Sequence, residues 1–170
     1  YVFSGWGTAA NSATASYVPG SSITMTKNTT LYAVWFKRFT LTYNVGSGTA
    51  GSTKSQNCTT TASDATSCSI TIASTAAPTR TGMGFYGWAS ANNTTRAYTA
   101  TGSVTMTANQ TIYAIYSVKL TFNANSGTGA PSAQTCYVSS TGTGCSITVS
   151  STKPTRANYT FTFPNQHFFA

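Results

Sequence analysis

The residues best suited to chemistry in this chain are four cysteines, which fall into two pairs. Cys58 and Cys68 are 10 residues apart, and Cys136 and Cys145 are 9 apart. Four cysteines allow three connectivities, but each pair recurs at the same place in a repeated sequence, which favours local pairing. Each bond would close a Thr/Ser-rich excursion, worth about 2.5 to 3 kcal/mol in the chain-entropy model. Because disulfides persist in oxidising compartments, we expect an extracellular or cell-surface protein.

A zinc site is the competing interpretation of the same cysteines. Structural zinc takes four Cys or His ligands, commonly with a short Cys-x₂₋₄-Cys spacing. Here the spacings are long, and the single histidine, His167, lies in the last residues of the sequence. We therefore expect the four cysteines to form disulfides, and we expect no metal and no cofactor.

Acid–base catalysis would need titratable groups close together. The chain has one acid, Asp64, and one histidine, so paired carboxylates and a Ser-His-Asp arrangement are not expected, and neither is an enzyme. Asp64 falls between Cys58 and Cys68 and is interpreted as a turn residue. The Gly-rich stretches 46–48 and 126–129 lack the Gly-Lys-Ser/Thr ending of a phosphate-binding loop and are interpreted as hairpin turns.

The composition indicates a folded β protein with few charges. Only 6% of residues are charged and the net charge is +8. The Lys and Arg residues are dispersed, whereas a nucleic-acid binder usually clusters them, so nucleic acid is not the expected partner. With 3 Trp, 10 Tyr and 9 Phe the chain is too aromatic for a disordered tail. No apolar run approaches the roughly 18 to 20 residues of a membrane span.

The elements that must position these residues are repeated along the chain, with a period of about 80 residues. The matching stretches are 1–6 with 83–88, 31–35 with 112–116, 41–44 with 120–123, 68–70 with 145–147, and 78–80 with 154–156. We expect small domains like beads on a string. Residues 39–119 form a complete repeat, 1–38 the second half of another, and 120–170 the first half of a third with an atypical tail at 163–170.

The two half-repeats allow two interpretations. The sequence is either a window on a longer array, or its halves complement each other between molecules, head to tail. A half-repeat leaves strand edges unpaired, and such edges recruit partner strands. Both interpretations remain open at this point.

Within the complete repeat the pattern predicts strands at 40–45, 68–73, 84–89 and 111–117, with a short fifth strand at 104–107. Apolar and polar residues alternate at 40–45, which ends at a Gly-rich turn, and at 68–73. The stretch 84–89 is rich in aromatic residues, and 111–117 is the most apolar run. No segment shows a 3.6-residue period, so at most one short helical turn is expected. Trp6, Trp35, Phe85, Trp88 and Tyr113 are expected to fill the core, because aromatic side chains dominate the burial available in small units.

Several motifs recur in a fixed order. They are Leu41-Thr-Tyr-Asn44, Ser69-Ile-Thr-Ile72, Ala77-Pro-Thr-Arg-Thr-Gly82, Phe85-Tyr-Gly-Trp88, Val104-Thr-Met-Thr107 and Thr111-Ile-Tyr-Ala114, with Thr30-Leu-Tyr-Ala-Val-Trp35 earlier in the chain. This succession resembles the Listeria–Bacteroides repeat, also called the internalin B repeat, over most of the chain. The cysteine pairs and the tail 163–170 depart from the family's usual pattern.

The resemblance implies compact β-grasp-like units of about 70 to 80 residues in tandem. Such units occur in bacterial surface proteins as spacers and adhesion modules. From it we expect a structural segment of a secreted stalk, adhesin or extracellular filament, with neighbouring repeats or copies of itself as partners. The alternative is an extracellular module that binds a host or cell-wall glycan or an anionic polymer through its basic, aromatic-bearing surface.

Overall fold

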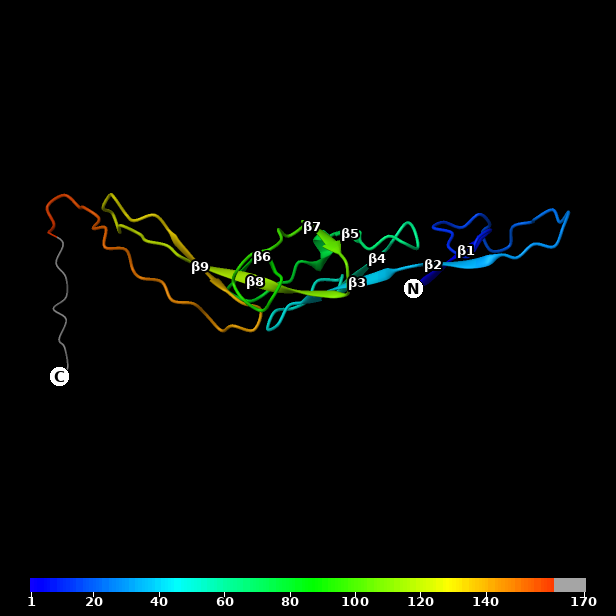
Figure 1. Cartoon of the computed structure of the whole chain (residues 1–170). Coiled ribbons are helices and arrows are strands. Elements are labelled where there is room, and N and C mark those ends of the chain that lie inside the picture. The colour runs from blue at the N-terminus through cyan, green and yellow to red at the C-terminus, as the bar shows by residue number, and fades with distance from the viewer. Residues whose placement is uncertain (161–170) are drawn as a thin grey trace.

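The computed structural model describes residues 1–160, which form an elongated, mainly β molecule (Figure 1). Three segments follow one another along its length: an N-terminal segment (1–38), a central segment (39–119) and a C-terminal segment (120–160). The N-terminal segment lies on the right of Figure 1 and the C-terminal segment on the left. The tail at 163–170, interpreted above as atypical, lies outside the described residues.

The central segment is built on a sheet with the order β4-β3-β8-β6. These strands are β3 (Arg38–Asn44), β4 (Ser55–Thr59), β6 (Gly84–Ala89) and β8 (Gln110–Leu120). The two inner strands, β3 and β8, are parallel, and the other pairs are antiparallel. The predicted strands 40–45, 84–89 and 111–117 are confirmed. The pattern missed β4, whose sequence Ser-Gln-Asn-Cys-Thr contains no apolar alternation.

A second, two-stranded sheet packs against the first. It pairs β5 (Cys68–Thr71) with β7 (Ser103–Met106), which confirms the strands predicted at 68–73 and 104–107. Within residues 1–160 there is one helical turn, η1, which spans Ser74–Ala76. One buried cluster joins the two sheets; its members include Leu41, Tyr43, Ile70, Ile72, Trp88, Val104, Met106 and Ile112. Burial of these apolar side chains is the main driving force for this segment's fold.

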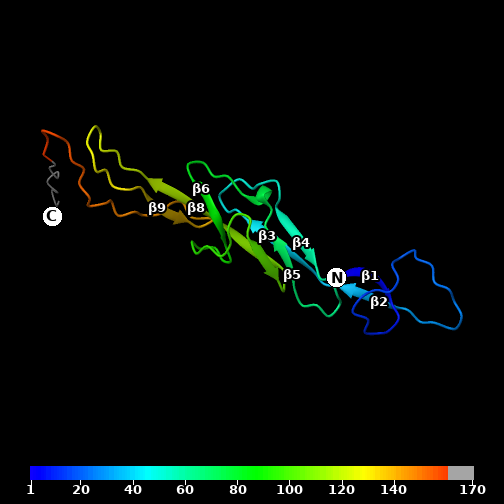
Figure 2. The ribbon, with the colours of Figure 1, turned by 90° about the horizontal axis from the view of Figure 1, so that it is seen from above.

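Strand β8 is longer than the central sheet requires. Of its 11 residues, 110–113 pair with β3, 113–117 pair with β6, and 116–120 pair with β9 (Gln134–Val138) of the C-terminal segment. A similar course links the other junction: β1 (Val2–Gly7) pairs with β2 (Tyr32–Phe36), and β3 starts directly after Lys37. Figure 2 shows these strands in line along the molecule.

The expectation that five aromatic residues fill the core is only partly met. Trp88 is completely buried, and Phe85 and Tyr113 are partly buried. The prediction is wrong for Trp6 and Trp35, which are 40% and 50% exposed. The physical reason is that the N-terminal segment contains a β1–β2 pair but no strands equivalent to β3 and β5 to cover it.

Candidate functional site

The β1–β2 pair has the same local structure as the β6–β8 pair. Each pair has a bulge at the same place, with Gly5 at φ 144° and Gly87 at φ 150°, a backbone conformation that favours glycine. The Trp6 amide donates to the Tyr17 carbonyl at 2.8 Å, and the Trp88 amide donates to the Tyr98 carbonyl at 2.9 Å. Equivalent sequence therefore gives equivalent backbone structure in both segments.

The two pairs differ in what covers them. Trp88 is fully buried beneath Tyr43 of β3, with ring centroids 5.0 Å apart, whereas Trp6 is 40% exposed. Met106 in β7 is fully buried, whereas Met25, its counterpart in sequence, is 57% exposed. The N-terminal segment thus presents to solvent the face that β3 and β5 cover in the central segment.

The C-terminal segment shows the reverse pattern. Ile72 is buried at 1% exposure, whereas its counterpart Val149 is 67% exposed. Residues 145–148 form no strand, although the equivalent Cys68–Thr71 is β5; residues 22–25 form none, although the equivalent Ser103–Met106 is β7. In the central segment β5 and β7 pair with each other. The C-terminal segment therefore contains the counterpart of β5, and the N-terminal segment contains the counterpart of its partner, β7. Each terminal segment has the strand sequence that the other one lacks.

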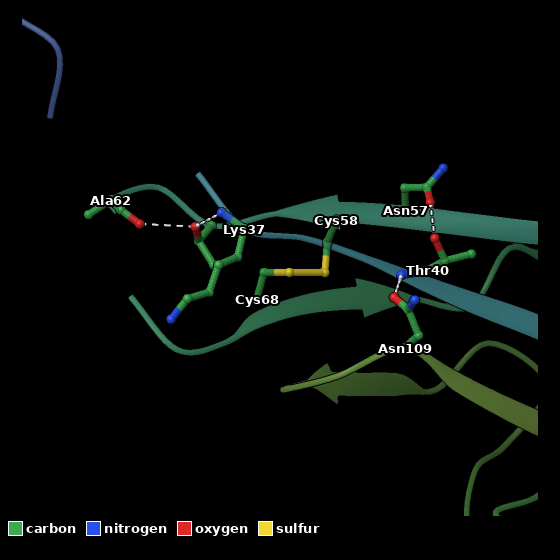
Figure 3. Close-up of a disulfide and its surroundings, with 8 residues drawn as sticks. Lys37, Thr40, Asn57, Cys58, Ala62, Cys68 and Asn109 are labelled. Carbon is green, nitrogen blue, oxygen red and sulfur yellow. Dashed lines mark hydrogen bonds between the residues drawn. A yellow bond between two sulfur atoms is a disulfide. The ribbon is translucent and has the colours of Figure 1, made fainter. Parts of the chain in front are cut away.

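Both cysteine pairs form local disulfides in the structure. The Cys58–Cys68 bond joins β4 to β5 with a Cα–Cα distance of 6.0 Å (Figure 3), and the Cys136–Cys145 bond has a Cα–Cα distance of 6.1 Å. Beside the first bond, the Asn109 side chain accepts a hydrogen bond from the Thr40 amide at 2.9 Å. Among residues 1–160 there is no free cysteine and no group of three or more His, Cys, Asp or Glu that could hold a metal ion.

The loop closed by Cys136–Cys145 docks on the central segment. The Arg80 guanidinium Nη2 donates to the Gly142 carbonyl at 2.6 Å, and the Ser47 amide donates to the Ser140 carbonyl at 2.9 Å. The Ser140 hydroxyl also donates to the Asn92 side chain at 2.9 Å. This loop is therefore a clamp between two consecutive segments, in addition to the shared strand β8.

The loop closed by Cys58–Cys68 makes the corresponding contact with the N-terminal segment. The Ser63 amide donates to the Ala13 carbonyl at 2.9 Å, and the Ser63 hydroxyl donates to the Ser12 carbonyl at 3.1 Å. Asp64 lies next to this contact, in a bend, at the edge of a cavity that Trp35 also lines. Each disulfide thus closes a loop that contacts the preceding segment.

Two tyrosines of the central segment, Tyr43 and Tyr116, have buried side chains. Burial raises the pKa of Tyr116, partly offset by the charge of Arg80, whose guanidinium lies 5.0 Å from the ring centroid. The Tyr116 hydroxyl donates to the Val45 carbonyl at 2.9 Å. Burial likewise raises the pKa of Tyr43, whose hydroxyl donates to the Gln56 side chain. Both hydroxyls therefore make hydrogen bonds within the central segment.

Sequence reasoning missed the clamping role of Arg80. A signal for it existed, because Pro78-Thr-Arg80 recurs as Pro154-Thr-Arg156, and a charged residue that recurs in a chain with so few charges needs a specific partner. The β9 strand was also missed, since its sequence Gln-Thr-Cys-Tyr-Val continues the hydroxyl-rich excursion without a strong alternation.

These features define a mainly β, disulfide-bonded protein in which each disulfide-closed loop contacts the preceding segment and strand β8 continues into the C-terminal segment. The family model of the Listeria-Bacteroides repeat domain matches residues 1–34, 39–115 and 119–163. The chain belongs to this family, whose repeats are typical of bacterial surface proteins. No curated protein and no solved structure matches the chain. Among residues 1–160, no helix has the length and apolar character needed to cross a membrane.

Proposed function

We propose that this chain is a non-catalytic structural segment of a secreted bacterial stalk, adhesin or extracellular filament, built from β-grasp-like units of about 80 residues in tandem. Its units associate end to end when the C-terminal segment of one copy completes the N-terminal segment of another. Its partners are therefore neighbouring units and copies of itself, outside the cell or on its surface.

The observation that carries this proposal is a difference in structure between equivalent sequences. Residues 103–106 form β7 and residues 68–71 form β5, whereas their counterparts at 22–25 and 145–148 form no strand. Propensity cannot explain the difference, because the sequences are nearly the same. What the counterparts lack is each other as a partner, and sheet stability comes from cross-strand pairs.

The pairing in the central segment gives the register of the proposed association. There Tyr43 lies beside Ile112 in the parallel pair and Ile70 lies opposite Val104 in the antiparallel pair. Translated to the terminal segments, Phe122 of one copy lies beside Leu31 of the next. Ile147 lies opposite Ile23, and Cys145 opposite Met25. Exposed apolar side chains of both segments become buried in this way, which provides the driving force.

A second candidate, a glycan or anionic-polymer binding module, is favoured by the exposed aromatic side chains on a chain of net charge +8. Tyr1, Trp6, Tyr32 and Trp35 are 82%, 40%, 40% and 50% exposed. Ionic strength separates the two candidates. Binding of an anionic polymer through Lys and Arg weakens strongly with added salt, whereas association through strands and apolar faces does not.

Sedimentation velocity of the chain over a range of concentrations tests the proposal. We expect species larger than the 17.7 kDa monomer, with Met25→Asp weakening association because it places a charge in the face to be covered. The matched control is Val18→Asp. Val18 is 64% exposed in the same connection between β1 and β2, but it faces no residue of the second copy in the proposed pairing. A chain that stays monomeric at every concentration, or equal effects of the two variants, would contradict the proposal.

A further inference from the structure

A cavity of about 200 Å³ lies on the C-terminal segment, between the turn after Phe122 and the segment around Pro154. Its lining includes Ala124, Asn125, Thr155, Arg156 and Tyr159. The Arg156 guanidinium lies over the Tyr159 ring, 4.4 Å from its centroid. Stacking on an aromatic ring leaves the edge donors of a guanidinium free to bind a carbonyl or carboxylate.

The same place on the central segment holds a docked loop. The residues of the central segment that receive this loop are Val45, Gly46, Thr79 and Arg80. They correspond in sequence to Ala124, Asn125, Thr155 and Arg156. Here the loop closed by Cys136–Cys145 binds, through the bonds from Ser47 to Ser140 and from Arg80 to Gly142.

The backbone frame of the two places is also the same. Thr49 and Thr79 exchange two hydrogen bonds of 2.7 and 3.0 Å, and Thr128 and Thr155 exchange two of 2.7 and 2.8 Å. Gly46 has φ 54° and Asn125 has φ 47°. The cavity at Arg156 therefore has the same backbone geometry as the site that binds a disulfide-closed loop on the central segment.

The chain contains one further loop of this kind, the one closed by Cys58–Cys68, and it carries Asp64, the only acid in the sequence. The Ser63 bonds to Ser12 and Ala13 hold this loop toward the N-terminal segment. Asp64 and Trp35 border a cavity of about 360 Å³ on that side. A C-terminal segment that covers the N-terminal segment would bring Arg156 to this cavity.

We propose that the cavity at Arg156 of one copy receives the loop closed by Cys58–Cys68 of a second copy, with Arg156 paired to Asp64. This inference rests on the end-to-end association proposed above and identifies the contact that aligns the two copies. It places the only acid of the chain against the one guanidinium that repeats the position of the Arg80 clamp.

One difference between the two places explains why the contact uses a carboxylate instead of a backbone carbonyl. A Cβ added at Gly46 would lie 2.0 Å from the Ser140 carbonyl oxygen, so the loop there tolerates only glycine. With Asn125 in that place, a docked loop must lie further away. The connection leading to the second loop is suitably longer, because Leu41 follows Trp35 by six positions, whereas Leu120 follows Tyr116 by four. Two extra residues add about 7 Å along a strand, and a side chain can span the larger gap.

Charge reversal in the full chain tests this pairing, with the association constant measured by sedimentation. Arg156→Glu and Asp64→Arg should each weaken association about tenfold, because like charges then face each other across the interface. The double variant carrying both changes should recover most of the loss. Lys119→Glu is the matched control, since it changes the net charge as Arg156→Glu does but lies at an exposed position on β8.

The outcomes separate this inference from the proposed function. Recovery in the double variant, with Lys119→Glu close to the unaltered chain, supports the pairing. If the chain associates but Arg156→Glu behaves like Lys119→Glu, the pairing is wrong and end-to-end association stands. The pairing is also wrong if both single variants weaken association and the double variant weakens it further. If the unaltered chain does not associate at all, the proposed function itself fails.

Discussion

The rings of Tyr43 and Trp88 lie 5.0 Å apart, centroid to centroid, and this contact closes the core of the central segment. Trp6 occupies the position of Trp88 in its own strand and keeps the neighbouring aromatic contact, with Phe3 at 5.3 Å in place of Phe85 at 5.1 Å. The residue equivalent to Tyr43 is Phe122, which lies in the segment at the other end of the chain. Equivalent tryptophans therefore differ in burial: Trp88 is a core residue, and Trp6 is exposed.

Truncation of these two tryptophans should have unequal effects. We expect Trp88→Ala to lower the free energy of unfolding by about 3 to 5 kcal/mol, because it leaves a large cavity in a closed core. Trp6→Ala should cost about 1 kcal/mol or less in the dilute, unassociated chain. Urea unfolding followed by circular dichroism measures both values. Similar losses for the two variants would show that the N-terminal segment is already closed.

The Cys58–Cys68 disulfide should stabilise the central segment measurably. We expect Cys58→Ser/Cys68→Ser to lower the free energy of unfolding by about 2.5 to 3 kcal/mol, since the unfolded chain regains the entropy of the loop. The comparison variant is Cys136→Ser/Cys145→Ser, whose loop contributes only Val138 to the buried cluster of the central segment. Urea unfolding, with intact mass to verify the remaining bond, gives both values; a larger effect for the second variant would contradict this assignment.

Removal of the Arg80 side chain should release the clamp while the strands remain paired. In Arg80→Ala the loop loses its bond to the Gly142 carbonyl, and the nearby bond from the Ser47 amide to the Ser140 carbonyl should open more often. Hydrogen exchange at the Ser47 amide reports this opening. Amides in the β8–β9 pair serve as the internal reference, and unchanged exchange at Ser47 would show that Arg80 does not hold the loop.

Alkaline pH should destabilise the central segment through two tyrosines. Burial raises the folded-state pKa of both Tyr43 and Tyr116 above the ordinary value of 10.0. The corresponding stability is fully present below pH 10, and it is lost as the pH rises toward and through the raised values, because the unfolded state releases its protons first.

Tyr116→Phe isolates one of the two groups. At neutral pH this variant loses the hydrogen bond to the Val45 carbonyl, about 0.5 to 1.5 kcal/mol. Above pH 10 its stability should fall less steeply than that of the unaltered chain. Urea unfolding at a series of pH values tests this, and parallel pH profiles would show that Tyr116 titrates normally.

Much of the fold was accessible from the sequence, for reasons that particular residues make clear. Alternation of apolar and polar residues located β3 and β5, because one face of each packs on the shared core. An aromatic-rich stretch located β6, the most apolar run located most of β8, and the short strand β7 was also expected. The strand β4 was not accessible, since Ser55–Thr59 has no apolar pattern and forms by pairing with β3 and by its disulfide. Pattern indicates which face of a strand is apolar, and an edge strand of polar residues gives no such signal.

The exposure of Trp6 and Trp35 could not be predicted for a different reason. Residue type indicates that a side chain would be stable when buried, but burial also needs a covering element. For Trp88 that element is β3, whose Tyr43 contacts the Trp88 ring although it lies 45 positions earlier in the sequence. The same long-range dependence hides the clamp, since Arg80 meets Gly142 across 62 positions of sequence.

Electron microscopy of the chain, at concentrations where sedimentation detects association, directly tests whether units complete one another end to end. End-to-end completion of units predicts continuous filaments with one uniform width and a regular spacing of units, which Met25→Asp abolishes and Val18→Asp preserves. Isolated particles with the dimensions of a single elongated molecule, at every concentration and in both variants, would contradict end-to-end completion.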